Sequence, residues 1–275
     1  MITVLLLACL QDEKTLDHSG QTRTYRLHMS KNATGPLPLV VALHGAMSSG
    51  RQMQALTKFD ALADEKGFAV VYPDGLKRIW RFAESDTDVG FLTALIDHLI
   101  EKGIADTSRI YVTGISNGAL MAHRLACDRA DRIAACATVA GTTMPALLEK
   151  LKPSKPVPLL YIHGTDDPVL GYDGTDRFTK RRMSLGAEEF VAWWAKKNGC
   201  GEKPEVEALP DRADDGTTVE RRTYGGGAPV VFYRIAGGGH TWPGGPGTEN
   251  RILGRTCKDL DASAAMWEFF AKYRR

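Results

Sequence analysis

The chain has 275 residues, of which 43% are hydrophobic and 25% are charged, a composition typical of a globular protein that folds as one large domain. Its 35 basic and 33 acidic residues give a formal net charge of +2, so charge offers no case for a nucleic-acid partner. No apolar run is long enough to be a transmembrane segment, and no repeat of fixed period indicates a solenoid or a propeller.

The N-terminus has three competing interpretations. The segment MITVLLLAC is apolar and ends at Cys9, which resembles the cleavage box of a bacterial lipoprotein with a lipid anchor at Cys9. The stretch is short and no basic residues precede it. We favour the remnant of an export signal or lipoprotein signal over residues 1–20, which predicts a secreted, periplasmic or lipid-anchored bacterial protein. The third interpretation is a first buried strand. Residues 21–275 are expected to form a single domain.

Apolar runs alternate with helical patterns along most of the chain. The runs that predict strands are 24–29, 37–45, 68–75, 109–114, 133–141, 157–164, 217–224 and 229–235. The spacing of apolar residues predicts helices within 53–67, 85–103, 119–126, around 190–194 and within 259–273. This alternation predicts an α/β fold with a mainly parallel sheet and helices on both faces. Ligands of such sheets bind outside the carboxyl ends of the strands, so the loops there are the candidate site.

The segment Gly114-Ile115-Ser116-Asn117-Gly118 lies where a strand pattern ends and a helix pattern begins. Gly-x-Ser-x-Gly alone is a weak signal in a chain with 28 glycines. The strand–serine–helix context is that of a nucleophile elbow, in which the serine occupies a strained turn and the glycines allow close backbone approach. Ser116 is therefore the candidate nucleophile.

Three other loops at predicted strand ends, HGAMSSG, HGTDDPV and GGGHTWPGG, carry candidate partners for Ser116. A serine hydroxyl needs a base, and a carboxylate must hold that base in one tautomer. The chain supplies Ser116, then Asp166 and Asp167, then His240, which is the order found in α/β-hydrolases. The residues alone do not separate Asp166 from Asp167.

His240 is the best base among the seven histidines, because it follows the carboxylates in the chain. His44 and His163 precede them, and we expect each to bond nearby backbone at a strand end. The other four histidines lie in helical patterns or near the N-terminus.

Two backbone amides are candidates for an oxyanion hole: that of Asn117, directly after the nucleophile, and that of Ala46, in the loop after Gly45. Trp242, two residues beyond His240, and Trp80, after the YPDG loop, are candidates for substrate contact. The alternative for both tryptophans is packing in the core.

The sequence contains no motif for a metal or a nucleotide cofactor: no His-Glu-x-x-His, no EF-hand and no phosphate or dinucleotide loop. None of the five cysteines lies in a Cys-x-x-Cys pair. Cys200 and Cys257 lie in polar surroundings and are candidates for pairing in an oxidising compartment. Cys127 and Cys136 lie near apolar runs and are expected to be buried.

Six segments together resemble the secreted polyhydroxybutyrate depolymerase and feruloyl esterase family of α/β-hydrolases: VVALHG, ADEKGFAVVYPDG, DVGFLTALIDHL, IYVTGISNGALMAHRLAC, HGTDDPV and GGGHTWPGG. The resemblance runs from about Thr24 to the C-terminus. It implies the α/β-hydrolase fold for residues 21–275, with Ser116 as nucleophile and His240 as base. It favours Asp167 over Asp166, because the family's aspartate directly precedes the proline of its HGTxDP motif.

The same resemblance implies export, no cofactor, and short-chain, hydroxyalkanoate or hydroxycinnamoyl (feruloyl) esters as substrates. Many relatives carry a cysteine after the HG motif or near YGG, where this chain has Ala46 and Gly227. A disulfide to Cys200 would therefore be reassigned to Cys257.

The sequence thus predicts a serine carboxylic-ester hydrolase that forms an acyl-enzyme with a small ester or a polymer-derived ester. Two alternatives stay open. The same triad serves serine peptidases and acyltransferases. The second alternative is a non-catalytic protein that binds carbohydrate or polyester through exposed tryptophans. An intact triad weighs against this alternative.

Overall fold

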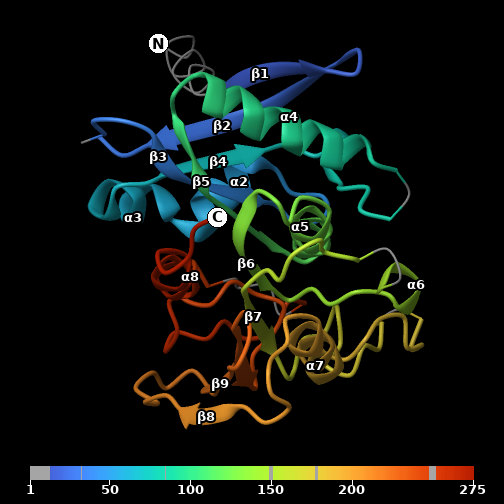
Figure 1. Ribbon diagram of the computed structural model, residues 1–275. Coiled ribbons are helices and arrows are strands. Elements are labelled where there is room, and N and C mark those ends of the chain that lie inside the picture. Colours follow the sequence, from blue (N-terminus) through green and yellow to red (C-terminus); the bar gives the residue numbers. More distant parts are fainter. Residues whose placement is uncertain (1–12, 32, 84, 149–150, 177–178, 248–251) are drawn as a thin grey trace, which may run out of the picture.

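The computed structural model describes residues 13–275 apart from 32, 84, 149–150, 177–178 and 248–251 (Figure 1). The described strands form one sheet in the order β1-β2-β4-β3-β5-β6-β7-β10-β9-β8. Neighbours from β4 to β10 in this order are parallel, whereas β1, β2, β9 and β8 add antiparallel pairs at the two edges. The carboxyl ends of the parallel strands therefore all lie on the same side of the sheet, which we call its carboxyl edge.

The strands are β1 Glu13–His18, β2 Gln21–Met29, β3 Leu37–Leu43, β4 Ala69–Pro73, β5 Ala105–Ile115, β6 Ile133–Val139, β7 Leu159–Gly164, β8 Glu205–Ala208, β9 Thr218–Tyr224 and β10 Val230–Ala236. The helices are α2 Gly50–Thr57, α3 Phe59–Lys66, α4 Thr87–Glu101, α5 Asn117–Asp128, α6 Pro145–Leu148, α7 Ala187–Lys197 and α8 Ala262–Phe270.

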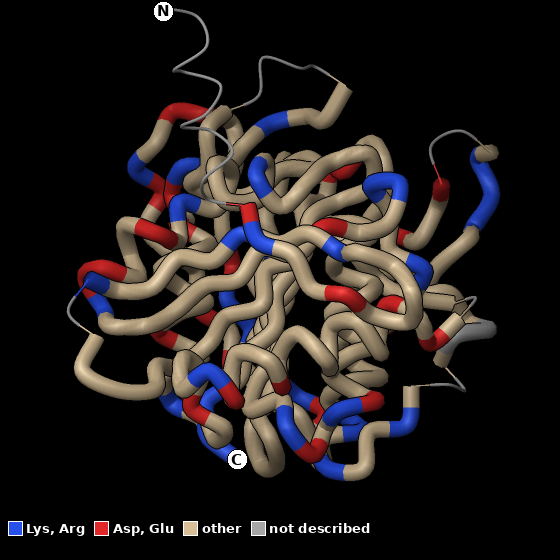
Figure 2. Tube along the Cα trace, turned by 90° about the horizontal axis from the view of Figure 1, so that it is seen from above, with Lys and Arg blue, Asp and Glu red and all other residues tan. Residues whose placement is uncertain are grey.

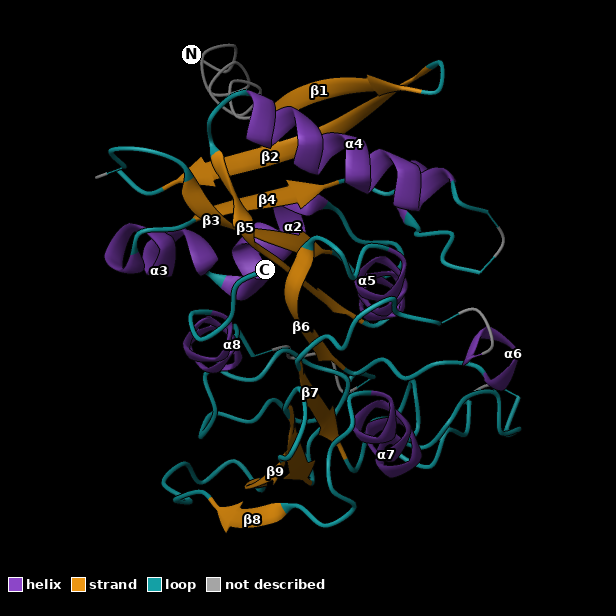
Figure 3. Cartoon of the chain, in the orientation of Figure 1, coloured by secondary structure: helices purple, strands orange, loops and turns teal. Residues whose placement is uncertain are grey.

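The central strands are apolar on both faces because helices cover both sides of the sheet (Figure 3). Along β3, Leu39 and Val41 pack into one buried cluster with α4, α5 and α7, whereas Val40 and Ala42 pack into the other with α2, α3 and α8. Each buried Val or Leu side chain contributes about 1.5–3 kcal/mol relative to an exposed one. The predicted parallel sheet with helices on both faces is confirmed.

The helix predicted within 53–67 is two helices, because the chain breaks at Lys58. Lys58 adopts a left-handed conformation with φ 53° and ends α2 by donating its amide to Gln54 O. The Thr57 hydroxyl donates to Met53 O and accepts from the amide of Phe59. This side chain therefore hydrogen-bonds two backbone groups at the point where the helix breaks.

Strands β1 and β8 were not expected from the sequence. Both are edge strands whose residues are mostly exposed, so neither has the apolar run of a buried strand. The predicted leader over 1–20 lies partly outside the described residues, with Cys9 among those. Glu13–His18, within that segment, pair with β2 and are part of the folded sheet.

The pairing of Cys200 with Cys257 is wrong for this structure. The four described cysteines, Cys127, Cys136, Cys200 and Cys257, are all free. Cys200 packs against the cluster that contains α7, and its thiol donates to Ala228 O at 3.1 Å. Cys257 is buried in the cluster on the opposite face of the sheet, so the sheet separates the two thiols.

No helix in the described part of the chain is long and apolar enough to cross a membrane. Basic and acidic positions are interleaved along the segments that surround the sheet (Figure 2). This distribution agrees with the nearly balanced charge of the sequence.

Candidate active site

Ser116 occupies a strained turn between β5 and α5. Its φ of 57° and ψ of −124° are unusual for a residue other than glycine. A side chain at Gly114 would place its Cβ 2.4 Å from Gly118 O, and one at Gly118 would lie 2.3 Å from Leu43 O. Both glycines are therefore required by close backbone contact, and the turn they allow leaves Ser116 partly exposed at the sheet edge.

The loop after β3 lies beside this turn. A Cβ built on Gly45 would be 3.6 Å from the Cβ of Ser116. Within the described residues, no hydrogen bond uses the backbone amides of Ala46 or Asn117. Asn117 is the first residue of α5, where amides have no partner within the helix. Two amides without a hydrogen bond to the described residues thus lie in the segments beside Ser116, which is what an oxyanion hole at this serine would require.

His44 fixes the start of this loop. Its Nδ1 lies 2.7 Å from Gly45 O, and its Nε2 accepts from the amide of Gly75 at 3.0 Å. Because a carbonyl can only accept, the imidazole is neutral with its proton on Nδ1. Burial lowers the pKa of His44, which agrees with that neutral form. The expectation that His44 bonds nearby backbone is confirmed.

The prediction that Trp80 contacts substrate does not fit the structure, because Trp80 is only 1% exposed and presents no free ring to a substrate. Its backbone amide donates to Asn117 Oδ1 at 2.7 Å, and its carbonyl accepts from Asn117 Nδ2 at 3.0 Å. Its indole Nε1 donates to His44 O at 2.9 Å. Two residues earlier, Arg78 O accepts from the amide of Met47 at 2.8 Å. The segment 78–80 therefore contacts both sides of the candidate oxyanion hole.

Trp242 is also buried, at 1% exposure, and the prediction that it contacts substrate does not fit the structure. Its indole Nε1 donates to Ser263 Oγ at 3.1 Å, and its ring packs edge-on against Phe59. Trp242 is a core residue that anchors the loop after His240 to α8.

Asp167 and His240 form a buried acid–base pair. Nδ1 of His240 donates to Asp167 Oδ2 at 2.8 Å, so this carboxylate sets the tautomer of the imidazole. The amides of Val169 and Leu170 donate to the other oxygen, Oδ1, at 2.8 and 2.9 Å. His240 Nε2 has no partner among the described residues and remains available for a proton transfer. Asp166 is exposed and faces Arg255 instead.

The ionised state of Asp167 depends on these hydrogen bonds. Burial alone would raise the pKa of the carboxyl, but hydrogen bonds and charge interactions with His163 and His240 hold that pKa well below its usual range. The group is therefore a carboxylate at neutral pH, as an aspartate that orients a histidine must be.

Close backbone contact joins the loops that carry Asp167 and His240. The amide of Asp166 donates to Gly238 O at 2.9 Å, and a Cβ on Gly164 would lie only 2.1 Å from Gly238 O. On the other side, the amide of His240 donates to Leu253 O. The glycines of the GGGH segment have no side chain, so the backbone fits between the loop that carries Asp167 and the segment at Leu253.

The topology places Ser116 at the same sheet edge as the acid–base pair, since β5, β6, β7 and β10 are consecutive in the sheet. Ser116 Oγ makes no hydrogen bond to the described residues. In enzymes without substrate, catalytic hydrogen bonds are often long and tighten in the Michaelis complex.

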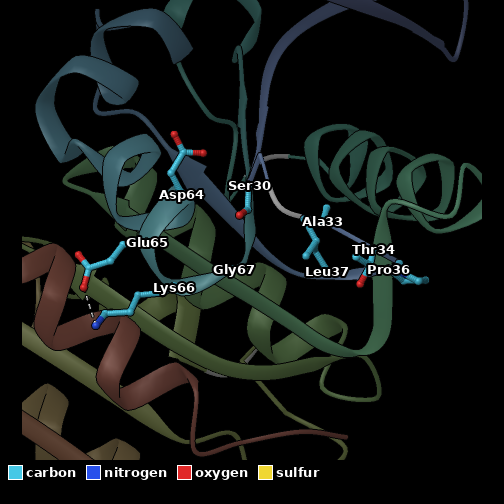
Figure 4. A pocket seen from close by; sticks show the side chains of 10 residues that line it. Ser30, Ala33, Thr34, Pro36, Leu37, Asp64, Glu65, Lys66 and Gly67 are labelled. Atoms are coloured by element: carbon cyan, nitrogen blue, oxygen red, sulfur yellow. Dashed lines mark ion pairs between the residues drawn. The ribbon is translucent and has the colours of Figure 1, made fainter.

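A hollow of about 440 Å³ lies at the amino ends of strands β3 and β4, on the side of the sheet opposite its carboxyl edge (Figure 4). Leu37, the first residue of β3, and Gly67, just before β4, are among its lining residues, and a Lys66–Glu65 ion pair lies at its rim. It is remote from the carboxyl ends of the strands and is not part of the candidate site. Among the described residues, no group of three or more metal-binding side chains is arranged as a metal centre.

Sequence reasoning missed two contributors to the site. His163 bonds backbone as expected, at Leu170 O, but its Nε2 also lies 3.4 Å from Asp167 Oδ2. Its position four residues before Asp167, across a tight turn, is the signal that would have identified it. The role of segment 78–80 depends on its backbone groups and on the buried indole of Trp80, and the sequence carries no such signal for it.

The chain is similar to several known esterases. The family model described as Esterase PHB depolymerase matches residues 24–147. NocK of Nocardia uniformis subsp. tsuyamanensis, which is named as an esterase, is 34% identical over 275 residues that cover 91% of this chain and 80% of NocK. Feruloyl esterase B of Piromyces equi is 30% identical over 215 residues, which cover 74% of this chain and 39% of that protein.

Poly(3-hydroxyalkanoate) depolymerase C of Paucimonas lemoignei is 28% identical over 248 residues, 80% of this chain and 59% of that protein. The chain thus spans only part of this relative and of the Piromyces protein. Among solved structures, the acetyl xylan esterase from Aspergillus awamori has a TM-score of 0.65 at 18% identity, covering 83% of this chain and 94% of that one. This likeness confirms the predicted α/β-hydrolase fold.

Proposed function

Because the chain belongs to the esterase PHB depolymerase family and is a carboxylic-ester hydrolase, we propose that it cleaves its ester through a triad of Ser116, His240 and Asp167. The observation that carries the proposal is the buried bond between His240 Nδ1 and Asp167 Oδ2, which leaves His240 Nε2 free at the edge where Ser116 lies. The strained backbone of Ser116 supports the same role.

In the first half of the reaction, Ser116 Oγ attacks the ester carbonyl while its proton passes to His240 Nε2. The amides of Ala46 and Asn117 donate to the oxyanion of the tetrahedral intermediate. The intermediate collapses when the C–O bond to the alcohol breaks, and the alcohol leaves with the proton from His240. Ser116 then carries the acyl group.

In the second half, His240 takes a proton from water, and the hydroxide formed attacks the acyl carbon. The same two amides bind the second oxyanion, and Ser116 regains its proton from His240 as the free acid leaves. Asp167 stays ionised throughout and stabilises the imidazolium that forms in each half.

For the substrate, we propose short-chain, hydroxyalkanoate or hydroxycinnamoyl esters, either small or derived from a polymer. The support is the names of two relatives, a feruloyl esterase and a poly(3-hydroxyalkanoate) depolymerase. Turnover of p-nitrophenyl butyrate, methyl ferulate and hydroxybutyrate oligomers should rank these classes. Faster cleavage of matched amides than of esters would instead favour the peptidase alternative.

The alternative of a non-catalytic protein that binds through exposed tryptophans is weakened, since Trp80 and Trp242 are buried. A fluorophosphonate probe tests catalysis directly, because it reacts only with an activated serine. We expect one adduct, on the peptide that contains Ser116, and none in Ser116→Ala. An unlabelled wild-type protein would overturn the proposal.

Export and lipid attachment at Cys9 remain a proposal supported by the sequence alone. Mass spectrometry of the protein from its native membrane and secreted fractions tests it. A diacylglyceryl group on Cys9 would establish the anchor, and an unmodified Cys9 in the mature protein would exclude it.

A further inference from the structure

His163, in strand β7, is a buried histidine that takes no part in the proposed reaction. It is fully buried, and its two ring nitrogens have different partners. Nε2 lies 2.9 Å from Leu170 O and 3.4 Å from Asp167 Oδ2. Nδ1 is hydrogen-bonded to the hydroxyl of Tyr161, which precedes it by two residues on the same face of the strand.

These partners determine the tautomer of His163. The carbonyl of Leu170 and the carboxylate of Asp167 can only accept, so Nε2 must carry a proton. Nδ1 faces the hydroxyl of Tyr161, which donates to it when the single proton of the imidazole is on Nε2. The Nε2–H of His163 donates to Leu170 O, and Asp167 Oδ2 lies 3.4 Å from the same nitrogen.

His163, Leu170 and His240 surround the carboxylate of Asp167. Leu170 accepts from His163 through its carbonyl and donates to Asp167 Oδ1 through its amide. Oδ2 faces His163 on one side and His240 on the other. The Asp167 side chain is fully buried, and its partners among the described residues are two histidines and two backbone amides, with no Lys or Arg. Each N–H donor therefore matters for keeping the carboxylate ionised.

The contacts run in series from Tyr161 through His163 and Asp167 to His240. Tyr172 is the other titratable group that faces His163, and its ring packs edge-on at 5.9 Å.

We propose that His163 is a positioning residue that holds the Asp167 carboxylate in the orientation which His240 requires, and that Tyr161 sets its tautomer. The inference rests on the proposed function, because it adds a support to the same triad. His163 touches neither substrate nor reacting atoms, so its effect reaches the reaction through Asp167.

Two substitutions at one position test the proposal. In His163→Gln the side-chain amide nitrogen reaches the place of Nε2 and still donates toward Asp167. In His163→Asn the amide reaches only the place of Nδ1, so that donor is lost. Losing one hydrogen bond to a charged group corresponds to about a 10- to 100-fold loss of rate. We expect a fall in kcat of that size for His163→Asn, with KM within about twofold, and recovery of most of it in His163→Gln.

The pH profile separates a positioning role from a merely structural one. A carboxylate with one donor fewer attracts the His240 imidazolium more strongly, so the acid limb of kcat/KM should move to higher pH in His163→Asn. Tyr161→Phe keeps the ring in place, removes the hydroxyl, and should move that limb in the same direction. If His163→Asn does not fold, the pH profile of Tyr161→Phe still tests the proposal.

Wild-type kcat and an unmoved pH profile in both His163→Asn and Tyr161→Phe would overturn the inference while leaving the proposed function intact. Equal losses in His163→Gln and His163→Asn would also overturn it. Failure of the proposed function is distinguishable, since wild-type turnover would then not depend on Ser116.

Discussion

His240 Nδ1 and Asp167 Oδ2 are 2.8 Å apart although 73 residues separate them in the chain. The parallel pairing of β7 with β10 explains this proximity, because Arg234 is opposite His163 and Ile235 is opposite Gly164. Both strands end at the same level of the sheet, and a short loop from each carries one partner. The pair is therefore a consequence of sheet register as much as of the two side chains.

Asp167→Asn should inactivate the enzyme without unfolding it. The amide keeps the shape of the side chain, but an NH₂ group at the Oδ2 position cannot accept from His240 Nδ1, so the imidazole loses its correct tautomer. We expect kcat to fall by roughly 10³- to 10⁴-fold. Steady-state kinetics checks this, with Asp166→Asn as the matched control, since Asp166 is exposed and should leave kcat within about twofold. Similar losses in both variants would refute the assignment.

Trp80→Phe should slow catalysis through the oxyanion hole. The change removes the indole donor to His44 O while an aromatic ring remains in the core. We expect kcat to fall about tenfold, the effect of one hydrogen bond of about 1.4 kcal/mol, with KM nearly unchanged. Trp194→Phe is the control, because Trp194 is equally buried and also loses one indole hydrogen bond, to Val157 O, at the end of β7 remote from the site. Equal kcat in the two variants would argue against the role of segment 78–80.

Gly118→Ala should destabilise the fold and disturb the elbow together. The new Cβ would meet Leu43 O at 2.3 Å and His44 O at 2.5 Å, and backbone atoms of a central strand cannot move aside. We expect a loss of about 3 kcal/mol or more in the free energy of unfolding, measured by denaturant titration. Gly35→Ala has open space and should have little effect. A stable, active Gly118→Ala variant would contradict the packing described here.

His123 should make the fold sensitive to acid. Burial lowers its pKa to about 3, whereas an unfolded histidine titrates near 6.5. Between these values the unfolded chain binds one proton more than the folded chain, so stability falls as pH drops, by about 1.4 kcal/mol per pH unit. Denaturant titrations from pH 7 to 4 should show a shallower decline for His123→Phe. An unchanged slope in that variant would show that His123 does not titrate as described.

Much of the fold could be predicted because its central strands are buried on both faces. β3, β6 and β7 are continuous apolar runs, and such runs alternating with helical patterns specify a parallel sheet. The edge strands β1 and β8 escaped prediction, since they are held by backbone pairing and have mostly exposed side chains. The break at Lys58 escaped for a related reason: a lysine gives no sign of a positive φ.

The candidate site was predictable where its chemistry lies in side chains at strand ends. Chain order within glycine-rich loops predicts Ser116, His240 and one of Asp166 and Asp167 as a set, and the family resemblance favours Asp167. Proximity to such loops in the sequence does not establish exposure, because Trp80 and Trp242 are both buried. The sequence predicts only the backbone contact of His163, because the approach of its ring to Asp167 depends on how the intervening turn folds.

The most direct test of the central claim is the kcat of Ser116→Ala on p-nitrophenyl butyrate. Removing the nucleophile should lower kcat by about 10⁴-fold or more while circular dichroism and thermal unfolding remain those of the wild type. Ser108→Ala, at the opposite end of the same strand β5, is the matched control and should keep wild-type kcat. Near wild-type turnover by Ser116→Ala would contradict the account.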